Sequence, residues 1–150
     1  MKVGLLIIAA SLAGSLLLTQ SAPAAEPEAK LEANKKAALD FWREVIEAHN
    51  VEAAKKYYAP DMIQHNRHVG QGLSGFESAF KAIWKEPLPV QATLKHPPIA
   101  VIADGDLVQL VFKIMVPEAG DKTRTHEAFE FDLFRLKDGM IVEHWDSDLE

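Results

Sequence analysis

The segment Thr125-His-Glu-Ala-Phe-Glu-Phe-Asp-Leu-Phe-Arg-Leu-Lys-Asp-Gly-Met-Ile-Val-Glu-His-Trp-Asp146 holds most of what the sequence says about its fold. It reads as two β-strands joined at Lys137-Asp138-Gly139, because glycine accepts positive φ and aspartate bonds its own backbone. Strand side chains point alternately to opposite faces. The first strand therefore carries Phe129, Phe131 and Leu133 on one face, and His126, Ala128, Glu130, Asp132, Phe134 and Leu136 on the other.

The register of this hairpin determines which residue meets Asp132. A three-residue loop, with Gly139 as a bulge, sets Asp132 opposite His144. A two-residue turn at Asp138 and Gly139 would place Trp145 there instead. We predict the first register, because an L-residue such as Asp138 is unstrained in it.

Asp132 is a candidate catalytic residue because it interrupts an otherwise apolar strand. A carboxylate is costly to bury without a partner. His144 would supply that partner, and the two side chains could exchange a proton. The alternative is a surface strand whose polar face lies in water.

The first 24 residues have the anatomy of a secretory signal peptide. Lys2 is followed by an apolar run from Val3 to Leu18 and by the small-residue cleavage site Ala22-Pro23-Ala24. An uncleaved anchor is the alternative, but the run is short for a membrane span. We therefore expect cleavage after Ala24, no stable membrane anchor afterwards, and a periplasmic or secreted domain over residues 25–150, with its core at about 36–146.

Composition narrows the classes of function. The net charge is −6, and the leader carries only Lys2, so the mature chain is one unit more negative. No basic stripe appears, so we expect no nucleic-acid partner. The chain has no cysteine, which excludes disulfides, thiol catalysis and cysteine-based zinc sites.

Helical spacing covers much of the first half of the chain. After an Ala/Glu-rich lead-in, it predicts a helix over about 31–48 and a short second helix, N-capped by Asn50, ending near Tyr58. Tyr58 then faces the core or the rim of a pocket. Ser74 and Glu77 form a capping box that opens a third helix ending near residue 85. Its expected buried side chains are Phe76, Ala79, Phe80 and Ile83.

Between these helices, residues 62–68 predict a half-buried turn rich in hydrogen-bonding groups. His65 and His68 have a spacing that suits a metal ion on a helical turn. No third ligand is evident nearby, however, and Pro60 and Gly70 oppose a helix here. We therefore predict no metal site, and His65 has either a structural or an acid/base role.

The remaining chain predicts strands at 90–94, 99–102 and 107–116, followed by the hairpin. Helices followed by consecutive antiparallel strands indicate an α+β fold. We expect a cone-shaped roll, in which a curved antiparallel sheet wraps against the N-terminal helices. The open end of such a cone is a site for a small molecule.

Several segments resemble the SnoaL-like branch of the nuclear-transport-factor-2-like superfamily. These are Tyr57-Tyr58-Ala59-Pro60-Asp61-Met62-Ile63-Gln64-His65-Asn66, Gly72-x-x-Gly75-Phe76, Ala103-Asp-Gly-Asp106, Asp132-Leu-Phe-Arg135 and Asp138-Gly-Met-Ile-Val-Glu-His-Trp-Asp146. The resemblance implies an α+β cone with a central pocket. It also implies kinship to polyketide cyclases, which close rings by aldol condensation, and to isomerases, dehydratases and binding proteins. By position, His65, Asn66, Asp132 and His144 would line the pocket, with Trp145 as a wall.

Three functions follow from these observations. The first is acid/base chemistry without a cofactor on a small, apolar carbonyl compound: aldol condensation, isomerisation or dehydration. Asp132 would take the proton, His144 would tune it, and His65 and Asn66 would bind the enolate oxygen. The remaining substrate contacts would come from Tyr58, Phe134 and Trp145. The second function is binding of a small molecule without catalysis. The third is a homodimer through the sheet, although core packing is the expected cover for the face with Phe129 and Phe131.

Overall fold

A computed structural model describes residues 28–147 of the chain. The predicted signal peptide and its cleavage site lie outside the described residues. The elements, in order, are helix α1 (Glu28–Phe41), the π-helical turn η1 (Trp42–Ile46), the 3-10 helix η2 (Val51–Lys56), β1 (Tyr58–Gln64), α2 (Gly72–Ile83), β2 (Ala100–Asp104), β3 (Leu107–Glu118), β4 (Asp121–Lys137) and β5 (Met140–Asp146). The predicted α+β class is confirmed.

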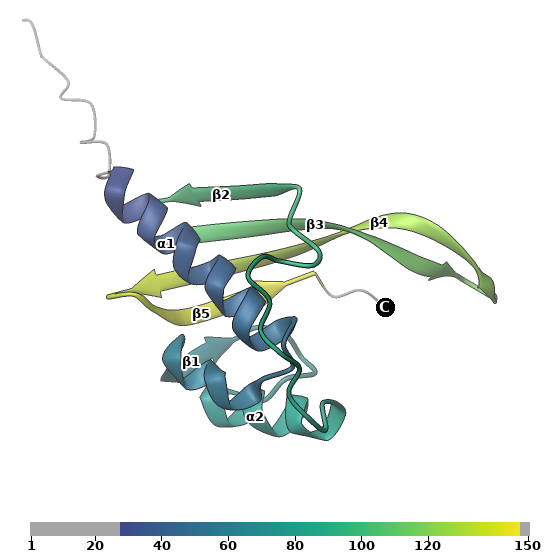
Figure 1. Cartoon of the computed structure of the whole chain (residues 1–150), viewed down its shortest axis with the longest axis horizontal. Coiled ribbons are helices and arrows are strands. Elements are labelled where there is room, and N and C mark those ends of the chain that lie inside the picture. Colours follow the sequence, from purple (N-terminus) through teal and green to yellow (C-terminus); the bar gives the residue numbers. More distant parts are fainter. Residues whose placement is uncertain (1–27, 148–150) are drawn as a thin grey trace, which may run out of the picture.

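The five strands form one curved sheet in the order β1-β5-β4-β3-β2. Helix α1 crosses one face of this sheet, α2 packs beside β1, and the β3–β4 hairpin extends well beyond the helices (Figure 1). Strands β2 to β5 pair antiparallel, whereas β1 pairs parallel to β5. Strand β1 replaces the predicted turn over 62–64. It can contain Pro60 because it is an edge strand, where the missing N–H breaks no ladder.

The hydrophobic core lies between α1, α2 and the inner face of the sheet. Phe41 packs against Tyr58 and Phe134, with ring centroids 4.7 and 5.7 Å away. Phe129 and Phe131 point to the other face, where each is 43% exposed. The expectation that the core covers them is therefore wrong, because α1 crosses the opposite face of the sheet, where Phe41 packs against Phe134 (Figure 1).

The first helices differ in detail from the expected ones. Helix α1 already includes Glu28, the first described residue, and ends at Phe41, where the π-helical turn η1 follows. The expected second helix is a 3-10 helix, and the Asn50 side chain accepts a hydrogen bond from the backbone N–H of Ala53, as predicted. No helix within residues 28–147 combines the length and apolarity needed to cross a membrane.

Helix α2 starts before the predicted capping box. It begins at Gly72, so Ser74 lies inside the first turn. Gly72 has a φ of +68°, and a Cβ there would lie 2.7 Å from the carbonyl oxygen of Pro60. Only glycine fits this close approach. At the other end of the helix, Ile83 is 67% exposed, so its predicted burial is wrong.

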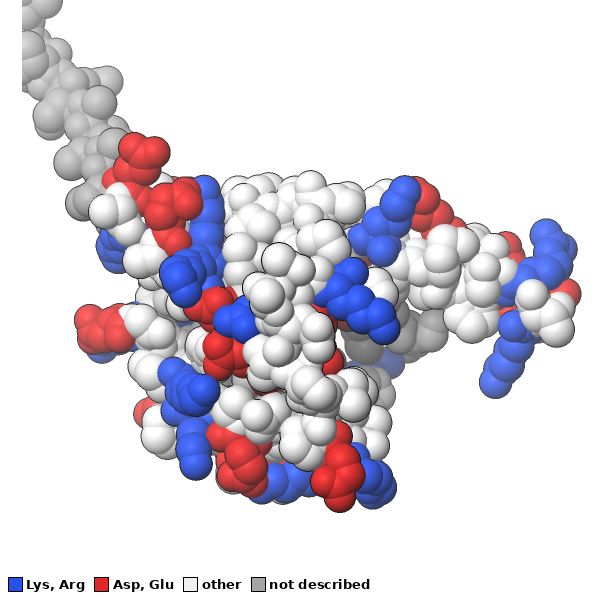
Figure 2. Space-filling view, viewed as in Figure 1, with Lys and Arg blue, Asp and Glu red and all other residues white. Residues whose placement is uncertain are grey.

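The segment between α2 and β2 contains no strand, so the strand predicted over 90–94 is wrong. Four prolines, Pro87, Pro89, Pro97 and Pro98, remove the backbone donors that a ladder needs. The segment runs across the front of the molecule instead (Figure 1). On the face shown in Figure 2, acidic and basic side chains are interspersed.

Candidate functional site

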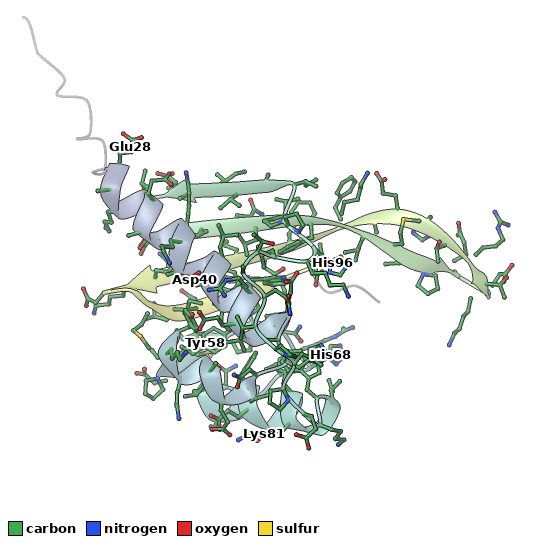
Figure 3. All side chains as sticks on the ribbon, in the orientation of Figure 1. Glu28, Asp40, Tyr58, His68, Lys81 and His96 are labelled. Carbon is green, nitrogen blue, oxygen red and sulfur yellow. The ribbon has the colours of Figure 1, made fainter. Side chains whose placement is uncertain are left out.

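A cavity of about 260 Å³ lies between the helices and the inner face of the sheet. Its lining combines aromatic and aliphatic side chains with a group of polar ones, which is typical of a small-molecule site. Tyr58 lies within the body of the domain, where it helps to close the cavity (Figure 3). The lining residues are Phe41, Trp42, Ile46, Tyr58, Gln64, Asn66, Val69, Phe76, Phe80, Glu130, Asp132, His144 and Asp146.

Asp132 and His144 meet inside this cavity. The distance between His144 Nε2 and Asp132 Oδ1 is 3.2 Å, and only 4% of Asp132 and 7% of His144 is exposed. Asp132 Oδ2 is buried and has no hydrogen-bond partner among the described residues. A buried acceptor without a hydrogen bond destabilises the fold, unless a bound ligand donates a hydrogen bond to it.

The hairpin register that joins the pair differs from the predicted one. The turn is the two-residue type, with Asp138 at φ 52° and Gly139 at φ 79°. A bulge at residue 142 then shifts the pairing, so Asp132 lies opposite Asp146 and His144 lies opposite Phe134. The predicted pairing of Asp132 with His144 is therefore wrong, as is the pairing with Trp145.

The bulge explains why the contact nevertheless forms. Without it, the two-residue turn would pair His144 with Leu133, on the outer face of the sheet. The extra residue returns His144 to the inner face, diagonal to Asp132. Phe134 stacks on the His144 ring, with centroids 4.9 Å apart, and limits its rotation.

Gln64 determines which nitrogen of His144 carries a proton. Gln64 Oε1 accepts the backbone N–H of Asn66 at 2.9 Å, so this atom is the carbonyl oxygen of the side chain. It lies 3.1 Å from His144 Nδ1, which must then donate. In the neutral imidazole, Nε2 is left as the acceptor that faces Asp132. The pair therefore shares one proton between Oδ1 and Nε2.

The amide of Asn66 contacts a second carboxylate in the cavity. Its Nδ2 donates to Asp146 Oδ2 at 2.6 Å. Within residues 28–147, Asp132, His144 and Asp146 each offer one ligand atom, and these atoms lie within 4.8 Å of one another. One histidine and two carboxylates form a donor set that could hold a divalent metal ion.

Burial changes the acidity of the lining groups. It raises the pKa of Asp132, and the hydrogen bond and charge of His144 oppose this. No described residue lowers the pKa of Glu130, and burial with the charges of Asp132 and Asp146 raises it to about 7. Burial and the same two charges raise the pKa of Tyr58 well above its ordinary value, so its hydroxyl stays protonated.

Two predicted site residues lie outside the cavity. His65 and Trp145 stack on each other, with centroids 4.8 Å apart, and neither lines the cavity. His65 Nε2 is 2.9 Å from Glu143 Oε1, and its side chain is 41% exposed. The expected pocket positions of these two side chains are wrong. The bulge returns His144 to the inner face, so alternation places Trp145 outside, and the pairing of Gln64 with His144 leaves the neighbouring His65 outside as well.

The other predicted residues lie within or directly behind the lining. Asn66, Asp132, His144 and Tyr58 line the cavity. Phe134 is fully buried behind His144. Their roles in chemistry or binding stay predictions.

His65 and His68, whose spacing suggested a metal site, do not point toward a common centre. His65 bonds to Glu143, whereas the Arg67 Nε–H donates to His68 Nε2 at 3.0 Å. The sequence reasoning also missed Gln64, Glu130 and Asp146 as lining residues. Strand alternation already placed Glu130 on the same face as Asp132, so the sequence could have predicted that Glu130 lines the cavity.

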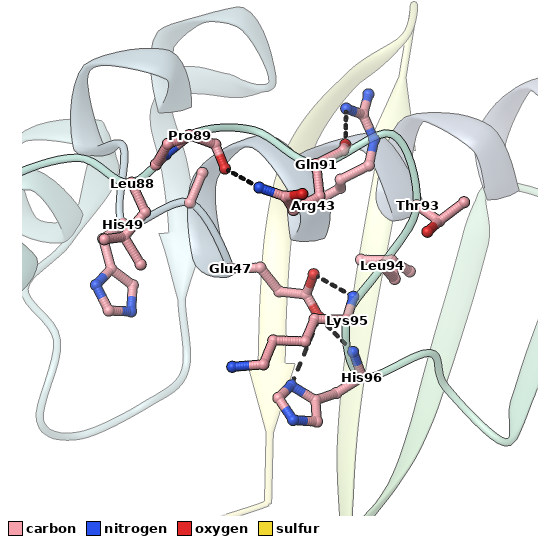
Figure 4. Close-up of a pocket in the computed structure, with 11 residues that line it drawn as sticks. Arg43, Glu47, His49, Leu88, Pro89, Gln91, Thr93, Leu94, Lys95 and His96 are labelled. Carbon is pink, nitrogen blue, oxygen red and sulfur yellow. Dashed lines mark hydrogen bonds and ion pairs between the residues drawn. The ribbon is translucent and has the colours of Figure 1, made fainter.

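A larger open groove of about 650 Å³ lies under the segment before β2 (Figure 4). Glu47 holds this segment in place, because its carboxylate accepts the backbone N–H groups of Lys95 and His96 at 2.8 Å each. Arg43 donates to the carbonyl oxygen of Gln91 at 3.1 Å. These contacts anchor a loop, and the groove lacks the buried acid/base pair of the smaller cavity.

The SnoaL-like domain family matches residues 38–144, which include Asp132, His144 and every other lining residue of the cavity except Asp146. The chain belongs to the SnoaL-like family. No curated protein matches the sequence significantly.

Solved structures share the fold of this SnoaL-like domain at low sequence identity. A candidate SnoaL-like polyketide cyclase from Jannaschia sp. CCS1 has a TM-score of 0.58 and 19% identity, over 81% of this chain and 89% of that one. A candidate polyketide cyclase from Acidithiobacillus ferrooxidans has a TM-score of 0.52 and 20% identity, over 77% of this chain and 87% of that one. An NTF2-like protein of unknown function from Burkholderia pseudomallei has a TM-score of 0.54 and 14% identity, over 77% of this chain and 89% of that one.

Proposed function

We propose that this SnoaL-like domain catalyses acid/base chemistry at a carbon beside a carbonyl group, without a cofactor. The reaction class is aldol condensation, isomerisation or dehydration. Asp132 is the proposed base, and His144 relays or holds the proton that the pair shares. A cavity of about 260 Å³ suits a small carbonyl compound.

The observation that carries the proposal is the state of the Asp132 carboxylate. One oxygen contacts His144, and the other is buried and unpartnered in a residue that lines the cavity. A carboxylate with a raised pKa is a stronger base than one in water, and enzymes tune such groups toward the working pH. Gln64 supports this role, because it directs His144 Nε2 toward Asp132.

The enolate oxygen needs donors other than His65, which lies outside the cavity. Asn66 has two N–H groups and gives one to Asp146, so the second is available to a ligand. The protonated Tyr58 hydroxyl is another candidate donor on the lining. Preorganised neutral donors of this kind stabilise a developing oxyanion.

Hydrogen exchange at the α-carbon tests the proposal without knowledge of the natural substrate. We expect the protein to accelerate the incorporation of deuterium from D₂O into small ketones, followed by NMR with EDTA present. Asp132→Asn should lower the rate by about 10² to 10⁴-fold, because the base is lost.

The matched control is Glu127→Gln, which removes a carboxylate from the exposed side of the same strand. It should keep the full exchange rate. Activity that survives in Asp132→Asn would show that the base is elsewhere, and activity lost on chelation would show that a metal ion is required.

The second candidate function is binding without catalysis, and the position of His65 favours it. With that side chain outside, the cavity has fewer oxyanion donors than the enzyme hypothesis expected. Recovery of unchanged ketones after long incubation, with saturable binding and no deuterium uptake, would support this function.

We also propose that the domain is exported to the periplasm or secreted. The support is the charged, apolar and small-residue pattern of residues 1–24. Mass spectrometry of the protein from the periplasmic or culture fraction should find a mature N-terminus after Ala24. Intact full-length chain in the cytoplasm alone would contradict export.

A further inference from the structure

We propose that the cavity of this SnoaL-like domain selects a ligand with a cationic head, such as an organic ammonium group, over neutral and anionic ligands. The inference deepens the proposed function and rests on it only in taking this cavity as the ligand site. Three features of the described residues support it: the charge of the lining, an unsatisfied carboxylate oxygen and the aromatic walls.

The charges that line the cavity are predominantly negative. Glu130, Asp132 and Asp146 contribute carboxyl groups, and the lining residues include no lysine or arginine. His144 contacts Asp132 Oδ1 and offsets part of the charge of that carboxylate. Asp146 contacts the uncharged amide of Asn66. An anionic ligand would therefore meet uncompensated negative charge in a desolvated site.

The buried oxygen of Asp132 is an independent sign of a missing donor. Asp132 is only 4% exposed, yet its Oδ2 has no partner among the described residues. An N–H of a bound ammonium would satisfy it with a charge-assisted hydrogen bond. Glu130 forms no ion pair with any described residue, since Lys113 lies opposite Phe129 on the outer face of the sheet, where it pairs with Glu127 at 2.9 Å.

Aromatic rings supply the rest of the binding surface. The walls of the cavity are formed by Phe41, Trp42, Tyr58, Phe76 and Phe80. The faces of such rings attract cations, and the effect is strongest where the cation loses its water. Carboxylates beside aromatic walls are therefore complementary to an alkylammonium ion, which has a charged head and an apolar skeleton.

The same charge would assist the proposed chemistry. Removal of an α-proton leaves negative charge on the enolate, which is unfavourable beside carboxylates. An ammonium group within the substrate offsets that charge in the transition state. The implied substrate class is a small amino ketone or another cationic carbonyl compound.

Three probes with one carbon skeleton separate charge from shape. They are 3,3-dimethylbutylammonium, 3,3-dimethylbutan-1-ol and 3,3-dimethylbutanoate, measured by calorimetry at pH 8 in low salt with EDTA. We expect the cation to bind about tenfold or more tightly than the alcohol, and the anion to bind most weakly. Equal affinities, or tighter binding of the alcohol or the anion, would overturn the proposal.

Two variants test whether the cavity is the source of this preference. Glu130→Gln should reduce the ratio of cation to alcohol affinity severalfold. Glu127→Gln, which removes the same charge from the outer side of β4, should keep the wild-type ratio. An equal loss in both variants would show that the preference reflects net charge alone, and it would overturn the proposal.

The outcome is separable from that of the proposed function. Preference for the cation without α-proton exchange would keep this inference and reject the catalytic role. Exchange of neutral ketones without preference for the cation would keep the catalytic role and reject this inference.

Discussion

Glu130 is the residue whose chemistry depends most on its surroundings. Its sequence context, an alternating strand, is compatible with a solvent-exposed carboxylate. The folded sheet instead places it on the cavity lining, near Asp132 and Asp146. Burial and these two charges raise its pKa to about 7, compared with an ordinary value of 4.5.

This shift predicts a pH-dependent effect of Glu130→Gln on stability. Between pH 4.5 and about 7 the folded protein keeps a proton on Glu130 that the unfolded chain has lost. The contribution of this group to stability therefore falls as the pH rises through that window. We expect Glu130→Gln to raise the free energy of unfolding by about 1 kcal/mol at pH 8, less than the full shift implies because the side chain is partly exposed.

Urea unfolding at pH 4 and pH 8 measures this effect. At pH 4 both states of the wild type hold the proton, so the variant should gain little. Glu127→Gln is the control and should show no such difference between the two pH values. A gain of equal size at both pH values would indicate a packing effect instead of the ionisation of Glu130.

At the scale of elements, the β5 bulge and the start of α2 determine the site. The bulge returns His144 to the inner face, as described above. Helix α2 contributes Phe76 and Phe80 to the cavity walls. Its position depends on a close contact between two backbones, because a Cβ on Gly75 would lie 2.1 Å from the carbonyl atoms of Gly70.

This contact predicts that Gly75→Ala is destabilising. The added methyl group cannot fit without a shift of the loop before α2, so we expect a loss of about 2 kcal/mol in the free energy of unfolding. Ser74→Ala is the matched control on the same turn. The capping box predicted from sequence would make it cost about 1 kcal/mol, whereas a helix that begins at Gly72 predicts almost no cost. Urea unfolding of both variants distinguishes these alternatives.

For the whole molecule, the outer face of the sheet is the main unexplained surface. Phe129 and Phe131 are each 43% exposed there, and Met115 is 61% exposed. Apolar side chains grouped in this way are typical of an interface. We propose that two copies pair through this face, which would bury these side chains against their equivalents.

Sedimentation velocity at high protein concentration tests the dimer. The wild type should sediment as a dimer, and Phe129→Lys/Phe131→Lys should sediment as a folded monomer, because two desolvated lysines oppose association. Ile83→Lys, which changes an apolar side chain on α2 that is 67% exposed, should stay dimeric. A wild type that stays monomeric would remove the proposal.

The sequence by itself determined the α+β class, the alternation of β3 and β4, and the candidate pair Asp132 and His144, but it missed strand β1 before helix α2. These follow from local periodicity and from the cost of a carboxylate in an apolar strand. The family resemblance, carried by residues such as Gln64 and Asn66, pointed correctly to the SnoaL-like fold.

Only the tertiary structure decided which side chains share the cavity. A one-residue bulge reverses the face of every residue after it, and periodicity before the bulge holds no information about it. The bulge, which only the folded structure shows, therefore decides that His144 lines the cavity and that Trp145 lies on the outer face of the sheet. Parallel pairing of β1 with β5 is likewise a contact between distant segments, and it brings Gln64 to His144 and leaves His65 beyond the cavity.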